Sequence, residues 1–313
     1  MTSTTSTTPT PSKLRAWYAA TRPRVFVATF VPMALTAVIA LQDGVFSLSA
    51  FVLSLIGVML LQTVANLVNE YADFYRGADD LKQAGQGMAI KQYGLSPREV
   101  LYGAIFCGVT ACLIGVYFLT QSGPWLLAIG LGGVLVAITY TAGPFPLAYH
   151  GLGEVAAGIF MGPMIVLGAY YVMNPHISAE KGVQLSLMAF PIMFTCANIL
   201  HANNIRDRDA DMAANKRTLA VRFGVQIARQ EYMVLMGAAY ISQIILVLIG
   251  WYPITTFISW LTLPLAARLI RTINTETDIA RLHIAQGQTA QHHGMFGFLI
   301  AIGWTILLLI KGA

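Results

Sequence analysis

Long apolar stretches without any charged side chain recur along this chain, and they constrain its fold more than any other feature. Between residues 25 and 310 they return at about the 20-residue length that a helix needs to cross a bilayer. Only 11% of the residues are charged, whereas a soluble domain has about 25%. The sequence therefore predicts an all-α polytopic membrane protein and excludes a soluble enzyme, a nucleic-acid binder and a secreted disulfide scaffold.

The apolar stretches divide the chain into spans and a short tail. Residues 1–14 are rich in Thr, Ser and Pro and hold no apolar block, so we expect a disordered tail. Residues 15–313 are expected to form a single domain, with nine transmembrane helices around a central cavity. The predicted spans are residues 25–42, 48–70, 99–119, 124–141, 153–173, 184–203, 232–250, 252–270 and 293–310.

The basic residues sort to one side of these nine spans. The N-terminal segment and the loops after spans two, six and eight hold 17 of the 19 Lys and Arg residues, leaving Lys181 and Lys311 for the other side. Lys and Arg are enriched in cytoplasmic loops. We therefore expect a multi-pass protein of the cell inner membrane with a cytoplasmic N terminus and an outer C terminus. This placement also accounts for the net charge of +5 without a nucleic-acid partner.

The acidic residues concentrate in two short segments, although acids are costly near a bilayer. Half of the fourteen lie in residues 66–80, after span two, and in residues 203–211, after span six. Both segments are on the predicted cytoplasmic side. Asn69 and Asp73 are four residues apart, and Asn203, Asp207 and Asp211 repeat this interval, so each set occupies one face of a helix.

Carboxylates repeated on one helix face repel each other unless a cation lies between them. Two such helix ends facing each other form an oxygen-lined site suited to Mg²⁺, which also accepts oxygens from a substrate phosphate. Asp209 is expected to point away from this face. The six histidines and three cysteines form no combination with a zinc-type ligand spacing. The acidic segments therefore predict a magnesium and phosphate site.

The two acidic motifs resemble those of the UbiA superfamily of intramembrane prenyltransferases. That superfamily has an Asn-Asp-x-x-Asp-type motif after the second span and an Asp-x-x-x-Asp motif after the sixth. Here the motifs read Asn69-Glu70-Tyr-Ala-Asp73 and Asp207-Arg-Asp-Ala-Asp211, with Glu70 in place of the usual Asp. The resemblance implies nine helices, an active site on the cytoplasmic side and Mg²⁺-dependent prenyl transfer.

Longer strings resemble the branch that prenylates 1,4-dihydroxy-2-naphthoate in menaquinone synthesis. They are Arg22-Pro23-Arg24 and the segments 73–79, 140–154 and 203–222. The resemblance implies transfer of a polyprenyl group from polyprenyl diphosphate to dihydroxynaphthoate, with decarboxylation to demethylmenaquinone. Two alternatives stay open. One is the same chemistry on 4-hydroxybenzoate or homogentisate, and the other is a cation transporter with the acids as its ion site.

Candidate site residues follow from the charges and the resemblance. The Mg²⁺ ligands are Asn69, Asp73, Asp207 and Asp211, and Tyr140 is a further catalytic candidate because an aromatic face stabilises a carbocation. Candidates for substrate binding are Asn66, Asp79, Lys91, Asn203, Arg206, Lys216, Arg217, Arg22 and Tyr149. Arg22 or Arg24 is expected to pair with the naphthoate carboxylate, and Glu154 is a candidate base. Beyond these substrates and the lipid bilayer, no protein partner is implied.

Overall fold

The computed structural model describes residues 12–77 and 89–312, and its regular elements there are helices, which confirms the all-α prediction for this part of the chain. Their bounds are α1 (Lys13–Thr21), η1 (Pro23–Phe26), α2 (Val27–Gln42), α3 (Leu48–Tyr75), α4 (Ala89–Tyr93), α5 (Pro97–Leu119), α6 (Trp125–Thr139), η3 (Leu147–His150), α7 (Gly153–Met161), α8 (Pro163–Met173), α9 (Ala179–Met188), α10 (Phe190–Arg206), α11 (Arg208–Ala213), α12 (Leu219–Phe223), α13 (Val225–Leu248), η4 (Ile254–Thr262), α14 (Leu263–Thr275) and α15 (Ile279–Lys311). Since α1 begins at Lys13, the last two residues expected in the tail are helical. Residues 1–11 lie outside the described residues.

The count of membrane-spanning helices differs from the predicted nine. Within the described residues, six helices are long and apolar enough to cross a bilayer, and α9 with α10, bent by 48°, raises this to seven. The expected span 124–141 falls short because α6 has only 15 residues. The expected span 252–270 falls short because it is divided between the 3₁₀ helix η4 and α14, which carries Arg268 and Arg271.

Local sequence signals explain where several helices begin and break. Ser96 and Glu99 form a capping box at the start of α5, with Pro97 in the first turn. Gly162 separates α7 from α8, and a Cβ on it would meet the carbonyl oxygen of Gly158 at 2.8 Å. Pro163 then starts α8. Small residues and prolines thus divide long apolar stretches into the shorter helices that line the interior.

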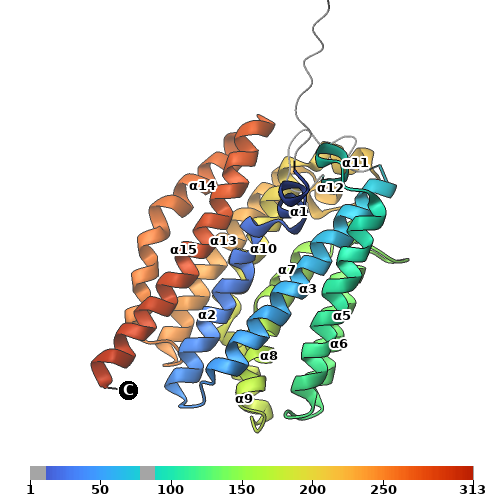
Figure 1. Ribbon diagram of the computed structural model, residues 1–313. Coiled ribbons are helices and arrows are strands. Elements are labelled where there is room, and N and C mark those ends of the chain that lie inside the picture. Colours follow the sequence, from blue (N-terminus) through green and yellow to red (C-terminus); the bar gives the residue numbers. More distant parts are fainter. Residues whose placement is uncertain (1–11, 78–88, 313) are drawn as a thin grey trace, which may run out of the picture.

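The helices form one bundle in which α2, α10, α13 and α15 pack together, while α3 runs along α5 on the other flank. Figure 1 shows α1, α11 and α12 at one end of the bundle and α9 with the C terminus at the other. Lys181 marks this second end, where its Nζ lies 2.8 Å from Oδ2 of Asp43. The hydroxyl of Tyr170 donates to the same oxygen at 2.6 Å. This cluster joins α2, α8 and α9 far from the acidic motifs.

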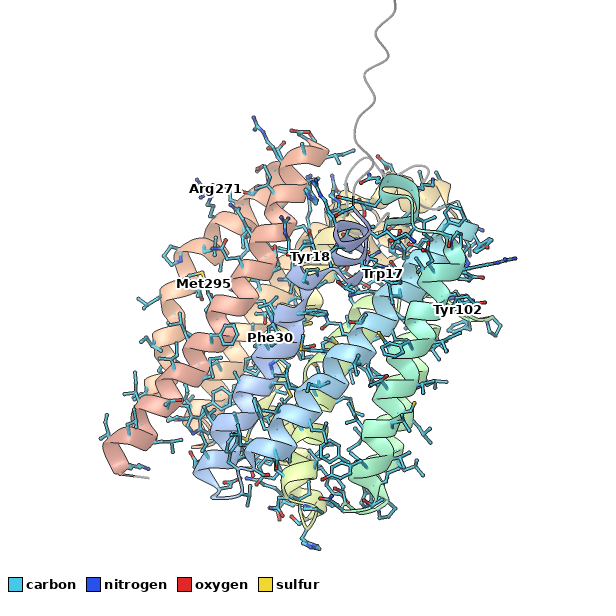
Figure 2. All side chains as sticks on the ribbon, in the orientation of Figure 1. Trp17, Tyr18, Phe30, Tyr102, Arg271 and Met295 are labelled. Atoms are coloured by element: carbon cyan, nitrogen blue, oxygen red, sulfur yellow. The ribbon has the colours of Figure 1, made fainter. Side chains whose placement is uncertain are left out.

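The outer surface is largely apolar, as expected for a wall that faces lipid. Figure 2 shows Phe30 and Met295 between the two ends of the bundle, and both are exposed. Tyr18 in α1 and Tyr102 in the second turn of α5 are also exposed. Interfacial aromatics of this kind form belts at a membrane surface. The fold is that of a multi-pass membrane protein, in agreement with the sequence.

Candidate active site

The first acidic motif lies near the C-terminal end of α3. With 28 residues, α3 is about 42 Å long, so it exceeds the hydrocarbon core of a bilayer. Asn69 and Asp73 share a face, and Nδ2 of Asn69 donates to Oδ2 of Asp73 at 3.4 Å. The amide oxygen of Asn69 accepts a 2.8 Å hydrogen bond from Nη2 of Arg22. Arg22 therefore holds the asparagine, and the asparagine holds the carboxylate.

Arg22 reaches this position through an unusual backbone conformation. It stands between α1 and η1 with a φ of 53°, in the left-handed region that residues other than glycine adopt rarely. Glu70 lies beside it, with Oε2 3.6 Å from Nη2 of Arg22. Glu70 also accepts a hydrogen bond from the backbone of Ile90 at 3.1 Å. It is buried and does not line the cavity described below, so it anchors Arg22 and α4.

The second acidic motif repeats this arrangement where α10 passes into α11. The backbone N–H of Asp207 bonds to the carbonyl of Asn203, and that of Asp211 bonds to the carbonyl of Asp207. The four-residue spacing therefore survives the break between the helices. Nδ2 of Asn203 donates to Oδ2 of Asp207 at 3.3 Å, and the amide oxygen of Asn203 accepts from Nη2 of Arg206 at 2.7 Å. Each motif is thus an Arg–Asn–Asp unit.

Arg206 is the most strongly bonded side chain of the second unit. Its Nε and Nη2 donate to the two carboxylate oxygens of Asp207 at 2.7 and 2.6 Å. Its Nη1 lies 2.9 Å from Nδ1 of His283, which must accept because a guanidinium only donates. The side chains of Arg206 and Asp207 are 2% and 5% exposed. A bidentate pair as buried as this fixes both groups firmly.

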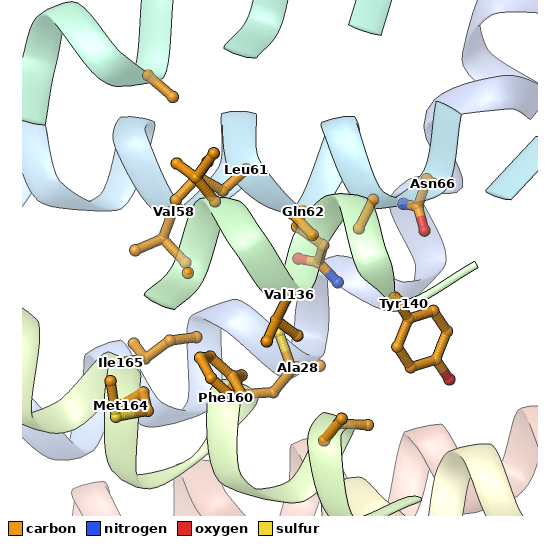
Figure 3. A pocket seen from close by; sticks show the side chains of 18 of the residues that line it. Ala28, Val58, Leu61, Gln62, Asn66, Val136, Tyr140, Phe160, Met164 and Ile165 are labelled. Atoms are coloured by element: carbon orange, nitrogen blue, oxygen red, sulfur yellow. The ribbon is translucent and has the colours of Figure 1, made fainter. Parts of the chain in front are cut away.

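A cavity of about 540 Å³ joins the two units. Figure 3 shows Asn66 and Tyr140 at one end of it and Val58, Met164 and Ile165 at the other. Asn69 and Asp73 of the first motif and Asn203 and Asp207 of the second also line it. Most of the remaining lining consists of apolar side chains of α2, α3, α5, α6, α7, α8 and α10. The volume lies in the range of ordinary ligand pockets. Its form suits a molecule with a charged head and a long apolar tail.

The charge at the polar end favours an anion. Five charged residues of the described chain line the cavity: Arg22, Arg206, Lys216, Asp73 and Asp207. Three cations against two carboxylates leave one net positive charge. Nine of the residues predicted from sequence line the cavity, namely these five with Asn66, Asn69, Tyr140 and Asn203. The two motifs, 130 residues apart in sequence, therefore meet in one chamber.

Two predicted residues lie just behind this lining. Nζ of Lys216 is 3.4 Å from Oδ1 of Asp211, which is buried. The hydroxyl of Tyr149 donates to Oδ1 of Asp73 at 3.0 Å. Burial, followed by the charge of Asp73, raises the pKa of the Tyr149 phenol above its usual value. The phenol therefore keeps its proton and remains a donor to Asp73 at neutral pH.

The other predicted residues lie farther from the cavity. Lys91 and Arg217 have exposed side chains and do not line it. Asp79 lies outside the described residues. Asp209 is 80% exposed and pairs with Arg208, so it points away from the site as expected. Arg24 is exposed as well, whereas Arg22 lines the cavity.

The oxygen-rich lining fits a hard cation. In residues 12–77 and 89–312, no group of three or more His, Cys, Asp and Glu side chains could hold a metal ion. A metal here would rely on fewer carboxylates, with water and substrate oxygens completing its shell. This is how proteins bind Mg²⁺, which keeps several waters and takes phosphate oxygens. Asp73 and Asp207 offer suitable carboxylates, and their donor chemistry fits Mg²⁺.

The sequence reasoning missed several polar residues of this chamber. Asn204 and Gln286 line it, and Asn204 donates to Glu154. Arg76 lies over the ring of Tyr149 at 4.5 Å and donates to the carbonyl of Thr141. Asn204 could have been predicted from the sequence, because a second amide beside Asn203 at the end of an apolar span needs a hydrogen-bond partner. Gln286 could not have been predicted, since it lies outside the spans predicted from sequence.

The fold and the site together define a class: an intramembrane enzyme that acts on an amphiphilic substrate with an anionic head. Comparison with known proteins identifies the family. Residues 30–288 match the UbiA prenyltransferase family, and the chain belongs to that family. It is a prenyltransferase, as the motifs indicated.

Curated relatives cover nearly the whole chain. The 1,4-dihydroxy-2-naphthoate octaprenyltransferase of Bacillus subtilis (strain 168) is 34% identical over 286 residues, 91% of each protein. The Escherichia coli (strain K12) protein of the same name is 28% identical over 93% of this chain and 96% of its own length.

Two solved structures share the fold. One is the apo form of a UbiA homolog from Aeropyrum pernix K1, with a TM-score of 0.69 at 16% identity over 92% of this chain and 98% of that one. The other is a UbiA homolog from Archaeoglobus fulgidus bound to GPP and Mg²⁺. It has a TM-score of 0.62 at 15% identity over 92% of this chain and 99% of that one.

Proposed function

We propose that this prenyltransferase moves a polyprenyl group from polyprenyl diphosphate to 1,4-dihydroxy-2-naphthoate, with loss of the carboxylate as CO₂, to give demethylmenaquinol, the reduced form of demethylmenaquinone. The names of the Bacillus subtilis and Escherichia coli relatives support this acceptor. The single observation that carries the proposal is the cavity, which is cationic at one end and largely apolar along the rest. Diphosphate and isoprenoid tail require those two environments in that order.

The charged end binds the diphosphate and its metal in this proposal. Asp73 and Asp207 hold Mg²⁺, which supplies charge stabilisation for the leaving diphosphate. Asp211 either holds Lys216 in place through their ion pair or is a further Mg²⁺ ligand, which is the role that the family motif implies. Arg22, Arg206 and Lys216 line the same end and bind phosphate oxygens. That a magnesium-bound structure exists for the Archaeoglobus fulgidus homolog supports this assignment.

Asn69 and Asn203 serve chiefly to hold the carboxylates in place. Each amide nitrogen donates to its aspartate, and each amide oxygen is occupied by an arginine. The expectation that Asn69 also binds metal stays a prediction, and it requires Arg22 to release the amide oxygen. Arg22 would then be free for the phosphate or for the naphthoate carboxylate. Its place in the lining favours it over Arg24 for that role.

Exclusion of water protects the allylic cation after the carbon–oxygen bond breaks. The apolar side chains of the surrounding helices enclose the tail and keep the reacting carbon dry. Tyr140 lies at the polar end of the cavity, where the reacting carbon follows the diphosphate. Its ring face stabilises the cation there. The electron-rich naphthoate ring then attacks the allylic carbon.

The orientation in the membrane follows from the basic residues. We propose that the end carrying α1, α11 and α12 is cytoplasmic, so the site opens to that side of the inner membrane. In this arrangement α6 and the η4–α14 segment complete nine crossings, with the C terminus outside. Residues 15–313 then act as a single domain.

Membranes that contain the protein test the proposal directly. Incubation with Mg²⁺, a polyprenyl diphosphate and each of dihydroxynaphthoate, 4-hydroxybenzoate and homogentisate should give prenylated product with the first acceptor. Asp73→Ala and Asp207→Ala should abolish product while the protein remains inserted and folded. Preferential use of another acceptor would overturn the assignment. A metal-ion flux across vesicles without prenyl transfer would favour the transporter alternative.

A further inference from the structure

A second polar cluster lies behind the cavity, apart from the two acidic motifs. Its members are Glu154 on α7, His201 and Asn204 on α10, and Glu231 on α13. Glu154, His201 and Asn204 are at most 4% exposed. Buried ionisable groups in the helices of a membrane protein are costly, and they often mark functional positions. The proposed reaction, as described above, gives this cluster no role.

The His201 ring connects Glu154 to α13. Nε2 of His201 lies 2.7 Å from the carbonyl oxygen of Ala228, so Nε2 must donate because a carbonyl only accepts. Nδ1 of the same ring lies 3.1 Å from Oε1 of Glu154. Oε2 of Glu231 is 3.6 Å from Nε2. The ring thereby ties Glu154 to α13 and holds its carboxyl group in one place.

Glu154 in turn fixes the orientation of the Asn204 side-chain amide. Nδ2 of Asn204 donates to Oε1 of Glu154 at 2.7 Å. An amide in the opposite orientation would bring two oxygen acceptors together, so the nitrogen must face the carboxyl group. Asn204 lines the cavity. Within the described residues, its side chain has no other hydrogen bond, so the amide oxygen is available as an acceptor on the cavity side.

The Asn204 amide oxygen faces the cavity without a protein partner in the described part of the chain, so a bound ligand that fills the cavity and displaces water should offer it a hydrogen-bond donor, and this restricts the ligand. The isoprenoid tail is apolar, and an ionised diphosphate only accepts hydrogen bonds. Of the two substrates, only the aromatic acceptor brings donors, in its hydroxyl groups. Asn204 follows Asn203 directly, so the same turn of α10 serves both the phosphate end and this position.

We propose that Asn204 binds a ring hydroxyl of the aromatic acceptor through its amide oxygen, and that the buried Glu154–His201 pair is a positioning device for this amide. The inference rests on the proposed function, because it needs an acceptor with a phenolic hydroxyl. The bond orients the ring so that the carbon to be prenylated faces the allylic carbon. Acceptors that lack the hydroxyl leave the oxygen of Asn204 unpaired and therefore bind more weakly.

A cycle of one enzyme change and one substrate change tests this pairing. The substrates are 1,4-dihydroxy-2-naphthoate and the two monohydroxy-2-naphthoates that each lack one ring hydroxyl. Their Kd values are measured by titration calorimetry on purified enzyme, and kcat/KM is measured where product forms. The parent enzyme should bind one monohydroxy analogue about ten-fold more weakly than 1,4-dihydroxy-2-naphthoate, as expected for loss of a single hydrogen bond. The Kd of that analogue divided by the Kd of 1,4-dihydroxy-2-naphthoate is the hydroxyl ratio. Asn204→Leu should reduce that ratio to about one while the KM for polyprenyl diphosphate is unchanged.

Two further variants separate positioning from general damage. In Glu154→Gln the new amide can either donate or accept, so it no longer fixes the orientation of the Asn204 amide. The hydroxyl ratio should therefore fall several-fold, without loss of folded protein. Asn198 provides the matched control, since it is fully buried on the same helix and donates to the carbonyl of Tyr232 instead. Asn198→Leu should leave the hydroxyl ratio at its parent value.

An unchanged ratio in Asn204→Leu would overturn the inference, and so would equal losses of affinity for the diphosphate and the acceptor. Calorimetry keeps this result separate from the proposed function. If the parent enzyme binds dihydroxynaphthoate without forming product, the proposed reaction fails while the binding ratio still decides the role of Asn204. If the parent enzyme binds none of the naphthoates, both statements fail.

Discussion

Replacement of Arg206 by Met should strongly destabilise the protein, and the size of the effect follows from the structure. Met fills similar volume but removes the bidentate bonds to Asp207 at 2.7 and 2.6 Å and the bond to Asn203. Asp207, 5% exposed, is then left as a buried carboxylate without its cation. Breaking one side of such a pair costs about 3–5 kcal/mol. We therefore expect Arg206→Met to lower the free energy of unfolding by this amount.

Reversible unfolding in mixed micelles, followed by circular dichroism during SDS titration, measures the change. Arg208→Met is the matched control, because Arg208 pairs with Asp209 at the exposed surface and should change stability by less than about 1 kcal/mol. The double variant Arg206→Met/Asp207→Leu removes both charges, so it should regain most of the lost stability. It should not regain activity. Equal stability of the Arg206→Met and Arg208→Met variants would refute the reasoning.

Four further outcomes follow from the site and the packing. Asp209→Ala should keep most of the parent activity and Asp211→Ala should lose it, because only Asp211 is buried against Lys216; prenyl transfer by purified protein measures both. Tyr149→Phe removes a buried hydrogen bond to the Asp73 carboxylate and should lower kcat/KM about ten-fold or more. Chelation of divalent cations should abolish binding of polyprenyl diphosphate, detected by calorimetry, and added Mg²⁺ should restore it. Gly303→Ala should destabilise the protein by about 1–3 kcal/mol, seen in the same SDS titration, because its Cβ would overlap the carbonyl of Thr255.

The sequence predicted the helical class because charge-free stretches of bilayer length have few other solutions. It predicted helix ends less well. The last predicted span began at residue 293, whereas α15 begins at Ile279. The residues between, from Ala280 to His292, include Gln286, Thr289 and His292, which hydropathy excludes from a span although all three are buried. Packing against neighbouring helices satisfies such side chains, and a single sequence does not reveal those neighbours.

The site was predictable where spacing alone determines geometry. The four-residue interval placed Asn69 beside Asp73 and Asn203 beside Asp207, and the structure shows both contacts. Contacts between distant segments carried no such signal. Nothing in the sequence pairs Tyr149 with Asp73, or His283 with Arg206, since 76 and 77 residues separate them. The roles of the predicted metal ligands stay predictions until metal binding is measured.

The charge of the cavity explains why metal and diphosphate should bind together. The described lining residues carry one net positive charge. A diphosphate trianion alone would leave two net negative charges in a chamber surrounded by apolar helices, and uncompensated charge is expensive in such surroundings. One Mg²⁺ cancels that excess, whereas a metal without substrate would raise the positive charge to three. Each ligand therefore makes the other easier to bind.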